Sequence, residues 1–417
     1  MKRRLILSVA DQAIVSAFNF GLNLFLIRMA APQEFGLFAI VTAASLFSTM
    51  VQNALVNTPL SVHLPIAPDD ARRTRLLRVF TAANALLTLL VVTIGGLTLA
   101  LWLGSGQSMT ALSACLYLAS QFVREYYRAL MAVEGRLASL FRTDLACIVL
   151  AVSALAALFV LDEAQRPILP SVFLIVGLAG TISIVPACIA SARLGSLRAL
   201  IADMRQVFRD QWHEIRWSLL GVITTEIQNR GYVYIAAAVF GPAAVAQLQA
   251  GRILFGPLNL LSGAWARGAR PQLAGLIGHA DASGFDAMLG RAMRGFALFN
   301  LLFLAGLWMV WPLLSPLVFH GKYPDLEYLV AAWGIANIAF QCRSCLGIGV
   351  QAMRRFRELT MATIAGAAVS LVLTAAACYA GQAIWLIGPV IAGECVALLI
   401  VLRILRRQRA ARPAFIG

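Results

Sequence analysis

The chain has 417 residues, of which 60% are apolar and only 13% are charged. A soluble domain carries about 25% charged residues. This composition, with a mean hydropathy of +0.80, therefore excludes an ordinary soluble protein and indicates an integral membrane protein. The net charge of +15 fits positively charged cytoplasmic loops better than a nucleic-acid-binding surface, and we expect no nucleic acid among the partners.

The sequence lacks the residue patterns of catalysis and of cofactor binding. The only Gly-Lys pair, Gly321-Lys322, is followed by Tyr323, whereas an ATP-binding P-loop needs Gly-Lys-Ser/Thr. No acid, base and nucleophile stand at a recognisable spacing. We therefore expect no enzyme activity, no cofactor and no metal site.

A membrane-spanning helix needs about 20 mostly apolar residues. The first such segment follows Lys2, Arg3 and Arg4 and is interrupted by Asp11, which favours an uncleaved span over a signal peptide. Twelve spans are predicted in chain order: 8–30, 35–60, 79–103, 109–133, 143–161, 168–191, 217–240, 243–265, 293–319, 325–350, 358–381 and 384–404.

Lys and Arg residues are distributed unevenly among the gaps between these spans. Most lie at the two termini and in the gaps that follow even-numbered spans, whereas the gaps after odd-numbered spans hold only Arg28, Arg166 and Lys322. Since cytoplasmic loops are enriched in Lys and Arg, both termini are predicted to lie in the cytoplasm.

The longest cytoplasmic gap, residues 193–216, lies at the midpoint of the chain. Its apolar residues recur at helical spacing with Arg and Asp opposite, which is typical of an amphipathic helix at a membrane surface. The apolar positions are Leu197, Leu200, Ile201, Met204, Val207 and Phe208. We interpret this segment as a cytoplasmic linker between two lobes, 1–192 and 217–417.

The two predicted lobes resemble each other at an offset of 210 residues. The identical pairs are Asn19 with Asn229, Gly21 with Gly231, and Pro32 with Pro242. Two hydrophobic halves also match by chance, but the matched positions are mostly not apolar. With six spans on each side, the pattern favours a duplicated six-helix unit, and transporters often bind substrate between such halves.

Polar side chains recur on one helical face of six predicted spans. These positions, in chain order, are Gln12, Ser16, Asn19 and Asn23; Thr42, Ser45, Thr49 and Gln52; Tyr117, Gln121, Arg124 and Arg128; Glu226, Asn229 and Arg230; Gln249, Arg252 and Asn259; and Asn337, Gln341 and Ser344, with Arg343 close by. Such faces line a bundle interior or a wet cavity, although single Ser, Thr, Asn or Gln residues also bond neighbouring helices. The predicted fold is therefore an all-α integral membrane protein with 12 transmembrane helices in two pseudo-symmetric six-helix bundles around a central cavity.

Five arginines stand on these polar faces, namely Arg124, Arg128, Arg230, Arg252 and Arg343. Glu226 is placed to pair with Arg230 and Glu125 with Arg128, and further acids are Asp11 and Glu394, so a set of structural ion pairs remains an alternative. Arg124, Arg252 and Arg343 have no acid nearby in the sequence. Because arginine binds phosphate and other planar anions through paired hydrogen bonds, the sequence favours an anionic substrate over a lipophilic cation.

Two segments resemble a known family. "DQAIVSAFNFGLNLFLIRMAAPQEFGLFAI", with its turn "PQEFG" at Pro32 to Gly36, and "QFVREYYRALMAVEGRLASLFRTDLA" are similar to bacterial polysaccharide-transporter flippases of the multidrug/oligosaccharidyl-lipid/polysaccharide exporter superfamily. The resemblance implies a multi-pass protein of the bacterial inner membrane. Such a protein moves an undecaprenyl-diphosphate-linked oligosaccharide between leaflets, in contact with membrane lipids and other polysaccharide-assembly proteins.

The resemblance also implies a set of substrate-binding residues. Cavity arginines, among them Arg124, Arg230 and Arg252, would hold the diphosphate, and amide side chains would bind sugar hydroxyls. The candidate substrate-binding residues are Arg124, Arg128, Arg230, Arg252, Arg343, Asn19, Asn23, Gln52, Gln121, Asn229 and Asn259. Compared with the peptidoglycan-precursor flippase of the superfamily, the chain lacks two C-terminal spans, which argues against that role.

Transport without an ATP site needs an ion gradient. Asp11 and Glu226 are the candidate proton carriers, although Arg230 near Glu226 disfavours its protonation. A multidrug-type cation antiporter of the same fold is the alternative function and predicts an acidic cavity with few arginines. Two other functions are further alternatives. A membrane-bound glycan ligase would need a large outward loop, whereas for a scaffold protein mutation of Arg252 would leave export unchanged.

Overall fold

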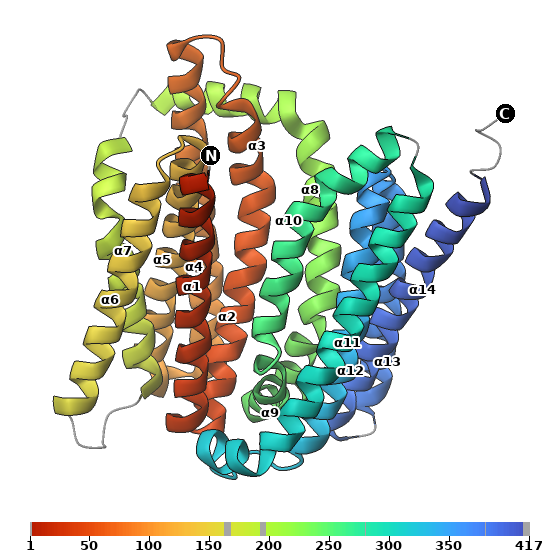
Figure 1. Cartoon of the computed structure of the whole chain (residues 1–417). Helices are drawn as coiled ribbons and strands as arrows, with labels where there is room; N and C mark the ends of the chain where they lie inside the picture. Colours follow the sequence, from red (N-terminus) through yellow and green to blue (C-terminus); the bar gives the residue numbers. More distant parts are fainter. Residues whose placement is uncertain (1, 162–167, 192–196, 280, 380, 412–417) are drawn as a thin grey trace. The chain divides into compact units, whose positions relative to one another are not determined.

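The computed structural model describes residues 2–161, 168–191, 197–279, 281–379 and 381–411 (Figure 1). Within these ranges the regular structure is helical throughout, and no strand occurs. Contacts divide the chain into two units: unit 1 is Met1–Asn23 with Val41–Ile223, and unit 2 is Leu24–Ile40 with Thr224–Gly417. Helices α1, α2 and α8 each contribute residues to both.

Unit 1 is built from the N-terminal helices. They are α1 (Lys2–Met29), α2 (Pro32–Gln52), the π-helix η1 (Asn53–Asn57), α3 (Thr58–His63), α4 (Asp70–Leu103), the short η2 (Ser105–Gln107), α5 (Ser108–Val133), α6 (Leu137–Leu161), α7 (Ile168–Ser191) and the first part of α8 (Leu197–Phe240). Local signals set the ends of α4: the Asp69 side chain accepts a hydrogen bond from the N–H of Arg72 at 2.6 Å, which is a typical N-cap. Gly104, with φ of 73°, ends the helix in a conformation that favours glycine.

Unit 2 contains the rest of α8 and the C-terminal helices. They are α9 (Pro242–Ile253), α10 (Gly256–Gly278), α11 (Ala282–Leu314), the π-helix η3 (Ser315–Phe319), α12 (Leu326–Ala352), α13 (Phe356–Cys378), the short η4 (Ala383–Leu386) and α14 (Ile387–Ala411). Asp281 caps α11, and the hydrogen bonds from Gly284 and Ser283 hold the pKa of its carboxyl below the usual value. Helix α12 is the centre of the unit, since it packs against α9, α10, α11, α13 and α14.

Nine helical segments among the described residues are long and apolar enough to cross a membrane. The other three predicted spans, residues 109–133, 217–240 and 243–265, are also helical. They form α5, the second part of α8, and α9 with the start of α10. These are helices on which the sequence places arginines and amides, and this polarity lowers their apparent hydropathy. The prediction of an all-helical, multi-pass membrane protein is confirmed.

The segment predicted as a surface linker is the first part of α8. Val207 is buried, and Leu200, Met204 and Phe208 pack against a core cluster formed by η1, α3, α4, α5 and α7. Asp203 also pairs with Arg75 of α4 at 2.7 Å. These residues therefore pack against the rest of unit 1, while Ile201 of the same segment is exposed, and the position on the membrane surface stays a prediction. The helix continues without a break into the seventh predicted span, and the predicted lobe boundaries stay a prediction.

The turn between α1 and α2 is bonded within unit 2. Lys322 donates hydrogen bonds from Nζ to the carbonyl oxygens of Arg28 at 2.5 Å and Ala30 at 3.0 Å. Arg28 in turn donates from Nη1 to the carbonyl of Leu317 at 2.9 Å. A Cβ on Gly36 would lie 1.8 Å from the carbonyl oxygen of Pro242, so this position accepts only glycine without a backbone shift.

Candidate functional site

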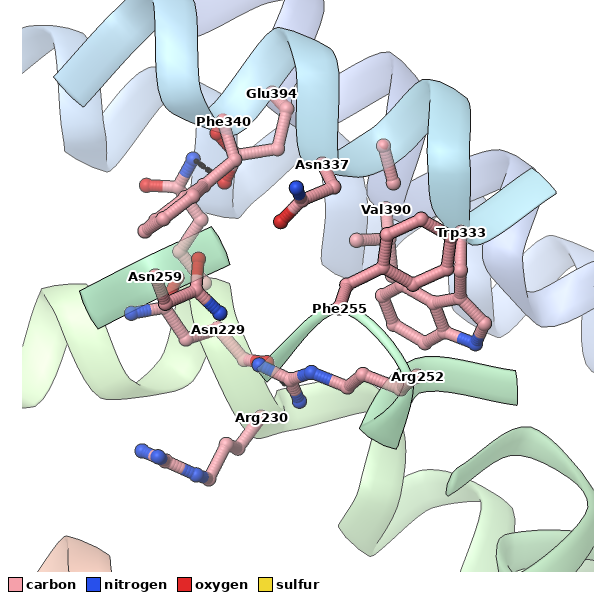
Figure 2. Close-up of a pocket in the computed structure, with 12 residues that line it drawn as sticks. Asn229, Arg230, Arg252, Phe255, Asn259, Trp333, Asn337, Phe340, Val390 and Glu394 are labelled. Carbon is pink, nitrogen blue, oxygen red and sulfur yellow. Dashed lines mark hydrogen bonds between the residues drawn. The ribbon is translucent and has the colours of Figure 1, made fainter. Parts of the chain in front are cut away.

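Unit 2 contains a partly open cavity of about 240 Å³ between α8, α9, α10, α12 and α14 (Figure 2). Amide, aromatic and charged side chains share its wall. The lining residues are Gln228, Asn229, Arg230, Arg252, Phe255, Asn259, Trp333, Ala336, Asn337, Phe340, Val390 and Glu394. Small-molecule sites have such a mixture of aromatic walls and a few placed polar groups, so this cavity is the candidate binding site.

Arg252 is held on the cavity wall by neutral groups. Its Nη1 donates to the hydroxyl of Tyr232 at 2.9 Å and to the carbonyl oxygen of Asn229 at 3.3 Å. Its guanidinium carbon lies 5.3 Å from the ring centre of Trp333 and 5.8 Å from that of Tyr232, within the range of cation–π attraction. In the described part of the chain Arg252 pairs with no carboxylate, so its charge is uncompensated.

The aromatic groups around Arg252 are themselves fixed. The indole N–H of Trp333 donates to the carbonyl of Leu248 at 2.8 Å, and the Tyr232 hydroxyl accepts a second hydrogen bond, from Gln249, at 3.1 Å. Tyr232 and Trp333 are both buried, at 2% and 5% exposure. Since each ring is held by a hydrogen bond as well as by packing, the guanidinium has one well-defined position.

The other two candidate arginines in unit 2, Arg230 and Arg343, are neutralised by acids. Arg230 pairs with Glu226 one helical turn earlier, which confirms the predicted pair. Arg343 binds Glu394 of α14 through two hydrogen bonds, Nε to Oε2 at 2.6 Å and Nη2 to Oε1 at 3.3 Å, and Gln228 donates to the same carboxylate at 3.0 Å. The sequence shows no acid near Arg343, and its partner Glu394 lies on another helix, as the alternative of structural ion pairs expects.

The two candidate arginines in unit 1, Arg124 and Arg128, lie in a charged cluster on α1, α5 and α6. Arg128 contacts three carboxylates: Asp144 at 2.7 Å, Glu125 at 3.1 Å and Asp11 at 3.1 Å. Arg124 pairs with Asp144 at 3.2 Å, and the side chain of Asp144 is fully buried. The predicted Glu125–Arg128 pair is confirmed. The sequence shows no nearby acid partner for Arg124, and the structure pairs it with Asp144 on the neighbouring helix.

Asp144 is the charged residue that the sequence reasoning misses. It stands at the beginning of the fifth predicted span, in "FRTDLA", where an acid is easily taken for a loop residue. The sequence does contain a signal for this residue, namely a carboxylate one residue inside an apolar segment. It becomes meaningful only when α6 is known to pack beside α5 and to bring Asp144 against two guanidiniums.

The predicted amide residues separate into three groups. Asn229 and Asn259 line the cavity of unit 2. Gln52 is fully buried and bonds Asn84 at 2.5 Å and the carbonyl of Phe122 at 2.8 Å, so it connects helices, as the alternative interpretation expects.

The remaining candidates lie on α1 and α5. Asn23 donates to the backbone carbonyl of Asn19 within α1 at 2.7 Å, the Asn19 side chain is exposed, and Gln121 is half-buried on α5. The aromatic wall residues Phe255, Trp333 and Phe340, and Asn337 beside them, were not among the predicted substrate-binding residues.

The two units therefore carry opposite formal charge at their polar centres. In unit 1, three carboxylates (Asp11, Glu125 and Asp144) face two guanidiniums. In unit 2, the carboxylates of Glu226 and Glu394 neutralise two of three guanidiniums, and Arg252 is the third. The net formal charge of these side chains is therefore negative in unit 1 and positive in unit 2.

Comparison with solved structures finds transporters of one superfamily. An inward-facing multidrug resistance MATE family transporter of the MOP superfamily is 12% identical, with a TM-score of 0.65 over 95% of this chain and 95% of that chain. The lipid II flippase MurJ in an inward closed conformation is 12% identical, with a TM-score of 0.69 over 96% and 87%. A MOP superfamily transporter from Pyrococcus furiosus, described as having a binding pocket of reverse polarity, is 10% identical, with a TM-score of 0.57 over 98% and 95%.

The sequence matches no protein-family model, and its comparison with curated proteins finds no match. At these identities the structural likeness shows the fold. The chain has the two-lobe, 12-helix fold of MOP-superfamily transporters, which confirms the predicted fold class. The three similar proteins are transporters or flippases rather than enzymes. A central cavity between the lobes stays a prediction.

Proposed function

We propose that the protein is a flippase that moves an undecaprenyl-diphosphate-linked oligosaccharide from the cytoplasmic to the outer leaflet of the bacterial inner membrane by alternating access. The glycan would be a repeat unit of an O-antigen, a capsule or an exopolysaccharide. The observation that carries the proposal is Arg252, a guanidinium that pairs with no carboxylate among the described residues and lies in a cavity lined by amides and aromatic rings.

An arginine inside a membrane protein is costly and is retained where it has a partner or a function. Arg230 and Arg343 have carboxylate partners. Within the described ranges the partners of Arg252 are neutral, so an anionic ligand would complete its environment. Amide groups supply both donors and acceptors, as sugar hydroxyls require. An anion that carries sugars fits both features at once.

Two further features support a lipid-linked substrate. The fold is shared with a lipid II flippase, and the N-terminal segment resembles polysaccharide-transporter flippases. The arginine-rich gaps that follow even-numbered spans favour cytoplasmic termini, and the family resemblance implies the bacterial inner membrane. The lipid tail would remain in the bilayer with membrane lipids around it, and proteins that extend or polymerise the glycan are the expected partners.

Ion coupling is assigned to Asp11 in this proposal. Asp11 is 5% exposed, its Oδ2 contacts Arg128, and its Oδ1 has no hydrogen-bond partner in the described residues. Because its cluster holds one more carboxylate than guanidinium, a single proton neutralises it. Glu226 already has Arg230 as its counter-ion, so it is the weaker of the two candidates.

A multidrug-type cation antiporter is the alternative, and one observation favours it. The negative surplus in unit 1, at Asp11 and Asp144, suits a cationic substrate as well as a proton. The proposed flippase places the anion in unit 2 and uses the unit 1 surplus for coupling. The antiporter places its cargo in unit 1 and leaves Arg252 without a role.

The test is deletion of the gene followed by analysis of lipid-linked glycans in the membrane. The proposal expects one lipid-linked glycan to accumulate on the cytoplasmic leaflet, and expression of the intact protein to clear it. Arg252→Ala should fail to clear it at normal protein level. Arg291→Ala is the matched control, since Arg291 is exposed on α11 and bonds its own helix.

Efflux of cationic dyes distinguishes the alternative. Dye efflux that depends on the protein, without any accumulated glycan in the deletion strain, would exclude the flippase and favour the antiporter. Clearance of the glycan by Arg252→Ala at the wild-type rate would remove the cavity of unit 2 from the mechanism.

A further inference from the structure

The cavity of unit 2 also indicates which part of a glycan it holds, and this inference rests on the proposed function. We infer that it binds one acidic sugar residue of the glycan, with the sugar carboxylate on Arg252 and the sugar ring against the aromatic wall. The diphosphate of the lipid carrier lies elsewhere in this assignment. Four features support this occupant: the charge of the cavity, the hydrogen-bond donors of Arg252, the chemistry of the lining residues and the size of the cavity.

The charge of the cavity fits a single negative group. Arg230 is neutralised by Glu226, and Arg343 by Glu394, which leaves the charge of Arg252 alone. Glu394 is itself on the cavity wall and places a carboxylate in the same space. A diphosphate carries more than one negative charge, so it would exceed the one surplus positive charge, whereas a sugar carboxylate matches it.

The free hydrogen-bond donors of Arg252 fit a carboxylate. A guanidinium has five N–H donors, and the two on Nη1 are directed to Tyr232 and Asn229. No described residue accepts a hydrogen bond from Nε or Nη2, and these two nitrogens form one edge of the planar fork. Two parallel hydrogen bonds along one edge are the usual geometry of an arginine–carboxylate pair.

The wall offers complementary groups for sugar hydroxyls. Asn259 accepts from Gln341 through Oδ1 at 3.2 Å, which leaves its NH₂ as a donor. Asn337 donates through Nδ2 to Asn300 at 2.6 Å, which leaves its Oδ1 as an acceptor. Figure 2 shows both side chains, with Phe340 labelled nearby. One donor, one acceptor and an aromatic surface can together orient a hydroxylated ring.

The size of the cavity limits the occupant to a single ring. Its volume is about 240 Å³, below the range of roughly 300–1,000 Å³ for sites that enclose drug-sized ligands. An oligosaccharide together with its diphosphate is too large for this space. One monosaccharide residue is of suitable size, and the rest of the chain would extend out of the cavity.

The first experiment is a composition analysis of the lipid-linked glycan that accumulates in the deletion strain. The inference expects a carboxylated sugar, such as a uronic acid, in the repeat unit. A repeat unit composed only of neutral sugars would overturn the inference and leave the proposed flippase intact. Absence of any accumulated glycan would instead contradict the proposed function, so the two failures are distinguishable.

The second experiment measures binding of that extracted glycan to the full chain in nanodiscs, before and after chemical reduction of its carboxyl groups to alcohols. Reduction removes the sugar carboxylate and retains the diphosphate. The expected result is about tenfold to hundredfold weaker binding after reduction, the range for a hydrogen bond to a charged group. In Arg252→Ala the native and reduced glycans should bind with nearly equal affinity.

Two controls make the comparison specific. Arg291→Ala should keep the difference between native and reduced glycan. Arg252→Lys keeps the charge but loses the planar fork, and it should recover only part of the difference. Equal affinity of the intact protein for native and reduced glycan would overturn the inference. An affinity that is lost in Arg252→Ala for both forms equally would assign the diphosphate to this cavity instead.

Discussion

The hydroxyl of Tyr232 accepts a hydrogen bond from Nη1 of Arg252 at 2.9 Å, and the same guanidinium lies 5.8 Å from the centre of the Tyr232 ring. One side chain thus holds Arg252 both by a hydrogen bond and by its ring face. Tyr232 is 2% exposed and does not line the cavity. It therefore acts as a positioning residue for the guanidinium that the proposed substrate contacts.

Tyr232→Phe removes the hydroxyl and keeps the ring, so it should change binding more than folding. We expect severalfold weaker binding of the extracted glycan, with a loss of about 2 kcal/mol in unfolding free energy, since the hydroxyl accepts two hydrogen bonds of about 1 kcal/mol each. Glycan titration in nanodiscs and thermal unfolding in detergent measure the two effects. Tyr234→Phe is the control, because Tyr234 is 37% exposed. Equal glycan affinity in Tyr232→Phe and the intact protein would show that the hydroxyl does not position Arg252.

Asp144 is predicted to be a stability residue. Its fully buried carboxylate faces Arg124 and Arg128, and removing one partner of a buried ion pair costs about 3–5 kcal/mol. Asp144→Ala should therefore lower the melting temperature and the membrane protein level strongly. Asp286→Asn is the control, since Asp286 pairs with exposed Arg409 and such surface pairs contribute about 0–1 kcal/mol.

Because Asp144 is predicted to stabilise the fold, loss of export in an Arg124 variant needs to be interpreted together with its protein level. Arg124→Ala would remove one of the two guanidiniums that pair with the buried Asp144. Loss of export in that variant would therefore reflect impaired folding. Normal protein level with lost export in Arg124→Ala would contradict the structural role and return Arg124 to the substrate-binding set.

Gly36→Ala should destabilise unit 2. The added Cβ would lie 1.8 Å from the carbonyl oxygen of Pro242, and a backbone atom cannot turn aside as a flexible side chain can. Overpacking of this kind costs about 1–3 kcal/mol. Thermal unfolding measures the loss. Gly21→Ala is the matched control, because its Cβ has no neighbour within 4 Å and alanine favours a helix. Equal melting temperatures of the two variants would disprove the contact.

Lys322→Met should loosen the turn between α1 and α2. The substitution keeps an apolar stem and removes the amine that binds the carbonyl oxygens of Arg28 and Ala30. Hydrogen–deuterium exchange should become faster at residues 24–40 and remain unchanged in the core of α12. Unchanged exchange throughout residues 24–40 would show that Lys322 does not hold this turn.

Asp11→Asn tests the proposed coupling. The substitution removes the exchangeable proton and should abolish export that depends on the proton gradient, at normal protein level. Glu226→Gln should reduce stability instead, because Arg230 loses its counter-ion. Export in proteoliposomes with and without a pH gradient separates the effects. Full gradient-driven export by both variants would exclude these two carboxylates as coupling groups.

The membrane-spanning helices and the helices that carry polar faces follow from residue order alone. Helical spacing needs no knowledge of neighbouring helices, so the stripe that contains Asn229 and Arg230 is apparent from the sequence. The pairs Glu226–Arg230 and Glu125–Arg128 are also predictable, since residues three or four apart on one helix are adjacent.

Which arginine keeps a free charge depends on how the helices pack. Arg124 pairs with Asp144, and Arg343 pairs with Glu394, in each case on another helix. Arg252 instead contacts the rings of Tyr232 and Trp333. Spacing along one helix cannot show this, because the rotation of each helix and the identity of its neighbours are set by packing over its whole length. In an interior without bulk water, the group that a charged side chain contacts decides whether its charge is neutralised. For Arg124 and Arg343 that group lies on another helix.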